Sequence, residues 1–113
     1  MNIQIFGTKK SFDTKKAQRY FKERRIKFQF IDLKEKEMSK GELQSVMRAV
    51  GGIDAVIDPD AKDQDTVALI THLAESQKFD KLLENQQVLR EPIVRNGAKA
   101  TVGYCPEVWK GWE

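Results

Sequence analysis

Ser11 is a hydroxyl residue that lies among four lysines and is the first candidate for a functional site. Lys9 and Lys10 precede it, and Lys15 and Lys16 follow it. A helix is expected to begin just after Ser11, and a helix N-terminus offers free N–H groups and a partial positive charge. Together these features suit an oxyanion, a carboxylate or an acidic partner surface. A purely solvated basic helix face is an equally good interpretation of the lysines.

Serine by itself is a weak nucleophile and needs a base to activate it. The only histidine, His72, falls in a helical stretch with no obvious route to Ser11. We therefore do not expect serine nucleophile chemistry. The simplest role for Ser11 is that of N-cap, in which its side chain accepts a hydrogen bond from a free helical N–H group. Asp13 is the alternative N-cap.

Cys105 is the only cysteine, so the chain has neither an internal disulfide nor a cysteine-rich metal site. It precedes Pro106, where a last helix is expected to begin, and a helix N-terminus lowers the pKa of a thiol. The alternative is a half-buried small apolar side chain between strand and helix.

Charge is distributed unevenly along the chain. Residues 1–50 hold 13 Lys/Arg against 6 Asp/Glu, whereas residues 51–113 hold 7 against 11. A basic half could attract nucleic acid, an anionic small molecule or an acidic protein. The pattern argues against direct DNA binding, because the basic stretch lacks a recognition-helix motif and interleaved aromatic residues. The aspartates of 54–65 lack the glycine and terminal glutamate of a calcium loop, so we expect no metal.

The elements that position these residues follow from hydrophobic periodicity. Short apolar runs predict strands at residues 3–6 and 28–32, and a helical period of apolar residues predicts a helix over 13–25. Ser39 and Glu42 fit a capping box, whose helix should stop at Gly51-Gly52. Two further helices are expected at about 65–75 and 78–88, with inward-facing leucines at positions 69, 73, 82, 83 and 89.

The C-terminal quarter begins at Pro92. Asn96-Gly97 between two apolar runs is a strong hairpin signal. Pro106 then opens a short helix whose Trp109 and Trp112 should pack on the sheet. The layout is βαβ, a helical insertion at about 39–88, and ββα, which predicts one domain over residues 1–113. The chain shows neither a membrane-length apolar run nor a leader pattern at its start, and we expect a cytoplasmic monomer.

With this order of elements, the chain resembles the arsenate reductase (ArsC)/Spx-like family. The segments that carry the resemblance are residues 5–17, 89–94 and 102–104. The resemblance implies a thioredoxin-like α/β fold with a four-stranded mixed sheet in the order 2-1-3-4. It also implies a cis peptide bond at Glu91-Pro92. In that fold Ser11, Arg90, Pro92 and Cys105 converge on one sheet edge, with Ser11 and Cys105 within about 15 Å of each other.

Several positions depart from the family pattern. Ser11 stands where the family has its reactive cysteine, and Thr14 stands where Spx-type members have a second one. Glu91 replaces the arginine that usually precedes the proline, and Arg90 lies one residue earlier. The mid-chain arginine that helps to hold the oxyanion has no counterpart between Gly51 and Lys62. The resemblance therefore implies a thiol oxidoreductase whose reductase activity is absent in this chain.

What the chain binds is inferred from the same resemblance. Members of the family are served by glutathione or glutaredoxin as co-reductant, and no bound cofactor is expected. Lys9, Lys10, Thr14, Lys15, Arg90, Pro92 and Cys105 are the candidate binding residues around Ser11. The alternative function is a redox-silent regulatory module that, like Spx-type regulators, binds RNA polymerase or another protein through its basic N-terminal half.

Overall fold

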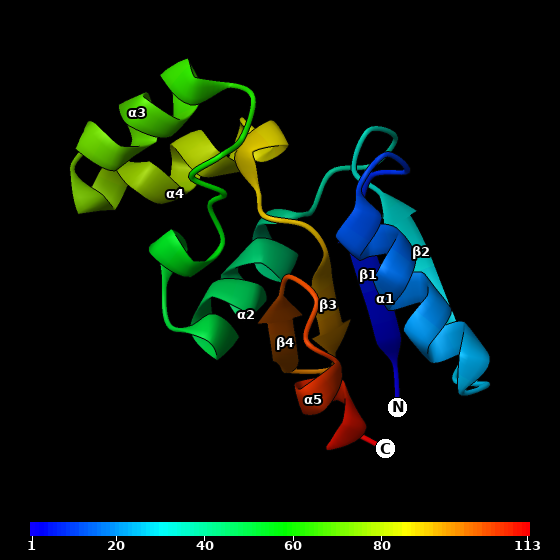
Figure 1. Cartoon of the computed structure of the whole chain (residues 1–113). Coiled ribbons are helices and arrows are strands. Elements are labelled where there is room, and N and C mark those ends of the chain that lie inside the picture. The colour runs from blue at the N-terminus through cyan, green and yellow to red at the C-terminus, as the bar shows by residue number, and fades with distance from the viewer.

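The computed structural model describes residues 1–113. Four strands form one mixed sheet in the order β2-β1-β3-β4 (Figure 1). They are β1 (Ile3–Gly7), β2 (Phe28–Asp32), β3 (Ile93–Asn96) and β4 (Lys99–Val102). β1 runs parallel to β2 and antiparallel to β3, and β3 runs antiparallel to β4. This is the thioredoxin-like order expected from the sequence.

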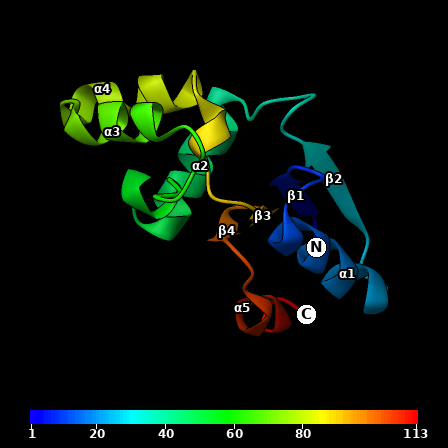
Figure 2. The same cartoon turned by 45° about the horizontal axis from the view of Figure 1, so that its top comes forward.

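The two faces of the sheet are covered by different helices (Figures 1 and 2). On one face, α1 (Phe12–Glu23) and α5 (Pro106–Lys110) enclose a core built around Ile3, Ile5 and Trp109. On the other face, Phe6 and Ile93 pack against α2 (Lys40–Val50) and the helical insertion. Alternation of side chains along β1 sends Ile5 and Phe6 to opposite faces.

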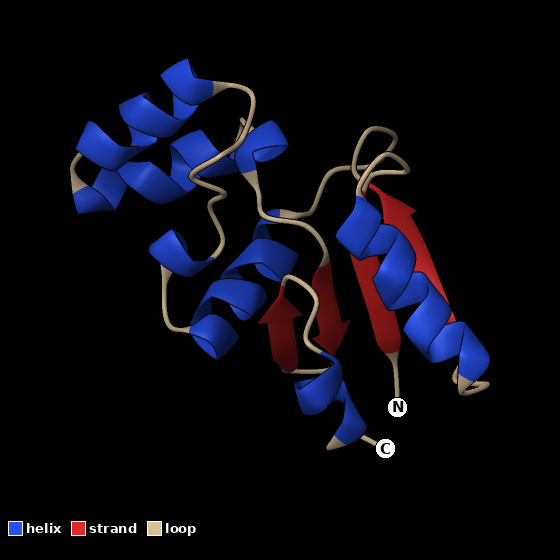
Figure 3. Ribbon diagram, in the orientation of Figure 1, coloured by secondary structure: helices blue, strands red, loops and turns tan.

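The helical insertion also contains α3 (Gln64–His72), α4 (Glu75–Leu83) and the 3-10 turns η1 (Ile53–Ala55) and η2 (Gln86–Val88) (Figure 3). Both predicted helices exist but end earlier than expected, and the second ends five residues before 88 because η2 replaces its last turn. Leu69 was expected inside and is 47% exposed, since Ile70 is the residue of α3 that faces the core.

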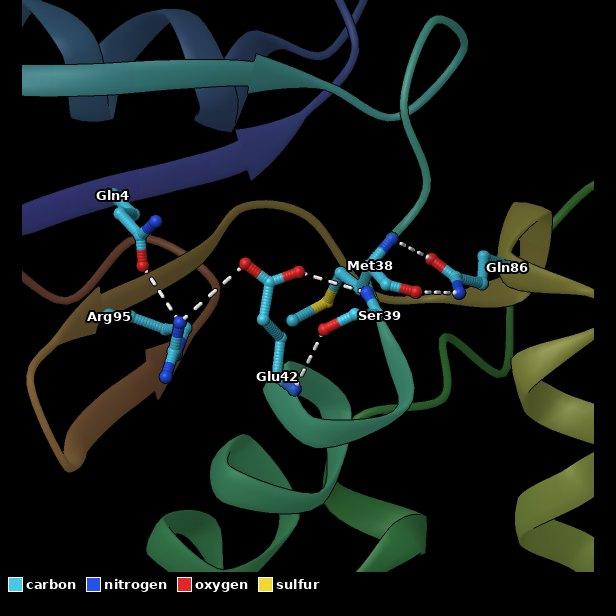
Figure 4. A network of polar contacts seen from close by, with 6 residues as sticks. All are labelled: Gln4, Met38, Ser39, Glu42, Gln86 and Arg95. Carbon is cyan, nitrogen blue, oxygen red and sulfur yellow. Dashed lines mark hydrogen bonds and ion pairs between the residues drawn. The ribbon is translucent and has the colours of Figure 1, made fainter.

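Local signals in the sequence explain most helix ends. Ser39 and Glu42 form the predicted capping box, with Glu42 N–H donating to Ser39 Oγ at 3.2 Å and Ser39 N–H donating to Glu42 Oε1 at 2.9 Å (Figure 4). Gly51 then ends α2 with a left-handed φ of 93°, a conformation that costs glycine little. Arg24 is the exposed C-cap of α1, one residue before the predicted end of this helix.

The C-terminal hairpin forms, but its turn is one residue later than predicted. Asn96 pairs with Lys99, so the two central residues are Gly97 and Ala98. Gly97 has a φ of 62° and Ala98 has no positive φ, which places glycine at the first central position. Pro106 begins α5 as expected, and Trp109 is fully buried with its indole N–H donating to Thr101 Oγ1 at 2.8 Å.

One side chain ties the two ends of the insertion together. The amide of Gln86 accepts from Met38 N–H at 2.8 Å and donates to Met38 C=O at 2.9 Å (Figure 4). Beside it, Arg95 of β3 donates to Gln4 Oε1 at 2.8 Å and lies 3.8 Å from Glu42 Oε2. The Gln86 bonds thus join η2 to the segment before α2, and the Arg95–Glu42 pair joins α2 to β3. None of the helices combines the length and the apolar character that crossing a membrane requires.

Candidate functional site

The candidate site lies where β1 ends and α1 begins. Ser11 is the N-cap of α1, and its Oγ accepts from the backbone N–H of Thr14 at 3.2 Å. Thr14 is fully buried beneath this turn. The capping role predicted for Ser11 is therefore confirmed, and Asp13 lies inside the first turn of the helix instead.

Glu91, two residues before β3, reaches the same turn. Its carboxylate accepts hydrogen bonds from Thr8 N–H, from Thr8 Oγ1 at 3.2 Å and from Thr14 Oγ1 at 3.2 Å. The Glu91-Pro92 peptide bond is cis, as predicted. A carboxylate from this chain thus occupies one backbone N–H and two hydroxyl donors of the turn beside the N-terminus of α1, which is the end of a helix that attracts anions.

Gly7 makes this approach of Glu91 and Thr14 possible. It is buried at the end of β1, and a Cβ atom at this position would run into the Thr14 side chain and come within 3.0 Å of Glu91 Oε1. Only a residue without a side chain fits between β1 and the two partners. The hydrogen-bonded cluster of Thr8, Thr14 and Glu91 therefore depends on a glycine at position 7.

A cleft of about 950 Å³ opens beside this turn, between the sheet and the helical insertion. Lys10, Ser11 and Phe12 line it from the α1 side, and Arg90 and Glu91 line it from the β3 side. Phe12 is 80% exposed. The rest of its lining includes the carboxylates Glu37, Asp58, Asp60 and Asp63 as well as Lys34 and Lys62, so the cleft is of mixed charge rather than a cationic pocket.

The remaining predicted site residues are dispersed. Lys9 is exposed and lines no part of the cleft, and Lys15 lines a different depression on the far side of α1. Pro92 is buried and its carbonyl accepts from Gly103 N–H at 2.8 Å. The candidate site therefore consists of the turn, its two threonines, Arg90 and Glu91.

Cys105 does not have the character of an activated thiol. Burial, reinforced by the nearby carboxylate of Glu107, raises the pKa of Cys105, and the charge of Arg90 only partly opposes this. The thiol donates to Val102 C=O at 3.4 Å and packs against the core around Trp109. Of the two interpretations of Cys105, activation of the thiol by the helix N-terminus is not supported, since α5 is short and Cys105 has no side-chain capping bond. The half-buried apolar role is the correct one.

His72 is an exposed residue of α3 whose Nδ1 lies 2.8 Å from Ala68 C=O. It therefore takes no part in the site. No group of three or more His, Cys, Asp or Glu side chains is arranged to hold a metal ion.

A sequence model of the ArsC family matches residues 6–112, nearly the whole chain. The chain belongs to the ArsC family. No curated protein matches its sequence closely. Solved structures agree in fold. Arsenate reductase from Vibrio cholerae superimposes with a TM-score of 0.81 at 21% identity, covering 96% of this chain and 94% of the other.

Two further structures show the same fold. An ArsC-family-related protein from Bacteroides fragilis has a TM-score of 0.83 at 16% identity and covers 100% of this chain and 98% of its own. An arsenate reductase (ArsC) related protein from Brucella melitensis has a TM-score of 0.68 at 16% identity, with coverages of 99% and 94%. This ArsC-family chain thus spans 94–98% of the length of these three structures.

The sequence did not reveal what Glu91 does in this ArsC-family protein. In the sequence, Glu91 stands out only because it replaces the arginine that the family usually has before this proline. The available signal was the pair of threonines at 8 and 14, whose hydroxyl groups flank the turn and need an acceptor once they are buried. A glutamate next to the cis proline opposite that turn is the matching acceptor.

Proposed function

We propose that this ArsC-family chain does not act as a thiol oxidoreductase and works instead as a redox-silent module that binds a protein partner. The observation that carries the proposal is the state of the turn at residues 8–14. Its N-cap position holds a hydroxyl group, and donors of the turn are occupied by the carboxylate of Glu91.

The chemistry of thiol exchange supports the first half of the proposal. That exchange needs a thiolate that attacks sulfur and can itself be released as a disulfide partner. Ser11 supplies no sulfur, and the raised pKa of Cys105 keeps its thiol neutral near pH 7. No residue of the chain is therefore equipped to start the reaction.

Anion binding at the turn is also disfavoured. An oxyanion that approached Thr8 N–H and the Thr14 hydroxyl would have to displace Glu91, and the displaced carboxylate would repel it. Arg90 lines the same cleft, but the carboxylates of Asp58, Asp60 and Asp63 lie in that lining too. Glutathione, which is itself anionic, meets the same obstacle.

A reductase assay tests the proposal that the chain is not a thiol oxidoreductase. The purified chain is mixed with arsenate, glutathione, glutaredoxin and an NADPH-coupled reductant, beside Ser11→Cys and Cys105→Ala variants. We expect no turnover above the protein-free rate for the wild-type chain and for Cys105→Ala. Turnover by the wild-type chain that disappears in Cys105→Ala would overturn the proposal, because Cys105 would then be the active thiol.

A binding role is the second half, and RNA polymerase is the partner suggested by the resemblance to Spx-type regulators. The uneven charge supports it, since a basic N-terminal half offers a contact surface to an acidic partner. Size-exclusion chromatography of the tagged chain with purified bacterial RNA polymerase is the first test. Co-elution at a fixed stoichiometry is expected. If the chain elutes alone from the polymerase and retains no macromolecule from lysate, the binding role is wrong.

A further inference from the structure

A second depression lies on the far side of α1 from the candidate site. It has a volume of about 880 Å³ and is open to solvent between α1 and the start of β2. Its charged lining consists of five cations and no carboxylate: Lys15, Arg19, Lys22, Arg25 and Lys27. Ile26 and Phe28 form its apolar floor. We call this surface the basic groove.

The cations of the basic groove form no ion pair within the chain, although the Lys15 ammonium lies over the Phe12 ring, 5.9 Å from its centroid. Lys15, Arg19 and Lys22 follow one another at helical spacings of four and three residues, so they share one face of α1. The four ion pairs of the structure involve none of the five groove cations. Glu23 is the only acidic residue between Thr14 and Phe28, and it does not line the groove.

The groove borders a free sheet edge. β2 is the outermost strand on this side, next to β1 alone (Figure 1). Leu33 N–H donates to Gly7 C=O at 2.9 Å, and in a parallel pair only alternate residues bond to the neighbouring strand. Counting back by two, Gln29 and Ile31 bond to β1. Phe28 and Phe30 therefore direct their backbone N–H and C=O groups outward, without a strand to pair with.

We propose that the basic groove binds an extended acidic peptide segment of a partner protein, which adds as a strand to the free edge of β2. Backbone groups of the segment pair with those of Phe28 and Phe30. Alternate side chains of an added strand point to one face of the sheet, so acidic residues at every second position meet the cations of α1. The inference rests on the proposed function, whose protein partner it describes.

An acidic peptide fits this surface better than a nucleic acid does. A nucleic acid could neutralise the cations, but it has no backbone that continues a sheet, and Phe28 and Phe30 would keep unpaired groups. The groove floor offers half-buried side chains, Ile26 and Phe28, whereas the exposed aromatic side chains that stack unpaired bases are not found in its lining. Apolar contacts beside cations suit a peptide that carries both kinds of side chain.

The experiment measures binding of a fluorescein-labelled peptide of about eight residues that alternates glutamate with threonine, the length of an ordinary strand. A second peptide of equal length and charge alternates glutamate with proline, which has no N–H group and cannot pair as a strand. Fluorescence anisotropy at low ionic strength gives the Kd. A labelled DNA duplex is titrated in parallel.

The matched variants change the net charge equally in two places. Arg19→Glu with Lys22→Glu alters the groove, and Lys36→Glu with Lys99→Glu alters exposed lysines elsewhere that form no ion pair. We expect the groove variant to weaken binding of the glutamate–threonine peptide about tenfold or more and the control variant to change it less than about twofold, since close charges dominate over distant ones. Hydrogen exchange of the Phe28 and Phe30 amides should slow when the peptide binds.

Three results would overturn the inference: equal weakening in both double variants, equal affinity for the proline peptide, or tighter binding of the duplex than of the glutamate–threonine peptide. If the wild-type chain is inactive in the reductase assay and binds a protein but does not bind the acidic peptide, only the groove proposal is wrong and the proposed function stands. If the wild-type chain reduces arsenate, the proposed function is wrong whether or not the chain binds the peptide.

Discussion

The carboxylate of Glu91 and the hydroxyl of Thr14 are hydrogen-bonded at 3.2 Å although 77 residues separate them in the sequence. The bond joins the segment before β3 to the first turn of α1. Because Thr14 is fully buried, its hydroxyl has no water to replace a lost partner. Glu91 therefore stabilises the conformation of the turn as well as occupying its hydrogen-bond donors.

Replacing Glu91 should destabilise the fold. Glu91→Ala leaves Thr8 N–H and the Thr14 hydroxyl without an acceptor, which costs about 1–3 kcal/mol for a buried donor. Glu91→Gln keeps one acceptor oxygen and should cost less. Urea denaturation followed by circular dichroism measures both. Glu35→Ala, at an exposed position of the loop after β2, is the control and should change the free energy of unfolding little. Equal stability of Glu91→Ala and the control would show that the cluster contributes nothing.

A thiol introduced at position 11 should be acidic. Ser11→Cys places sulfur where Ser11 Oγ now accepts from Thr14 N–H, and a hydrogen bond to the charged form stabilises a thiolate. The helix N-terminus and Lys10 act in the same direction. We expect the pKa to fall below the value of about 8.5 for a free cysteine.

The rate of iodoacetamide alkylation against pH measures this pKa, in a Cys105→Ala background so that one thiol reports. Adding Glu91→Gln removes a neighbouring negative charge and should lower the pKa of the introduced thiol further. An ordinary pKa in both variants would mean that the turn no longer favours a thiolate.

Cys105 should behave in the opposite way. Burial and Glu107 raise its pKa, so the thiol stays protonated in the folded chain at pH values where the unfolded chain is already ionised. In that alkaline window the unfolded state has lost a proton that the folded state keeps, and stability therefore falls as the pH rises. Cys105→Ala should show a shallower alkaline loss of stability than the wild-type chain. Alkylation of the native wild-type chain should be half-maximal above the pH found for the urea-unfolded chain.

Asp63 should make folding sensitive to acid. As the N-cap of α3 it accepts from Thr66 Oγ1 at 2.6 Å, and this bond, helped by Gln87, lowers the pKa of Asp63. A lowered pKa means that the stabilisation is complete above the pKa of the unfolded carboxyl, about 3.9, and is lost as the pH falls through the lower folded value. Asp63→Asn retains a capping oxygen but does not titrate. Its thermal midpoint should therefore fall less than that of the wild-type chain on going from pH 5 to pH 3.

The parts of the fold that could be predicted from the sequence are those that depend on contacts between residues close together in the chain. Ser39 with Glu42 and Pro106 each fix a helix end through contacts within a few residues. Strand order followed from the family resemblance. The turn of the hairpin was misplaced because Asn96-Gly97 and Gly97-Ala98 both supply a glycine, and only the pairing of Asn96 with Lys99 decides between them.

The site was harder to predict because its bonds are long-range. The turn at Ser11 and the importance of residues 90–92 were foreseen, but the link from Glu91 to the two threonines was not, since it depends on how closely β1 and β3 approach at Gly7. The sequence left two interpretations of Cys105 open for a related reason: the burial that raises the pKa of its thiol depends on the packing of the whole core and not on the short helix that follows it. The separation of Ser11 and Cys105 stays a prediction that rests on the confirmed strand order.

The contact of Gln86 with both backbone groups of Met38 has a consequence for how the chain comes apart. It brings the start and finish of a long insertion to one point, which suggests a module that could be removed and replaced by a short linker. The apolar core argues otherwise, because Phe6, Ile31 and Ile93 of the sheet belong to the same cluster as Leu43 and other residues of the insertion. Melting the insertion would leave one whole side of the sheet bare in water. The sheet and its insertion should therefore unfold in a single cooperative step, with no stable half-folded form in which only the sheet survives.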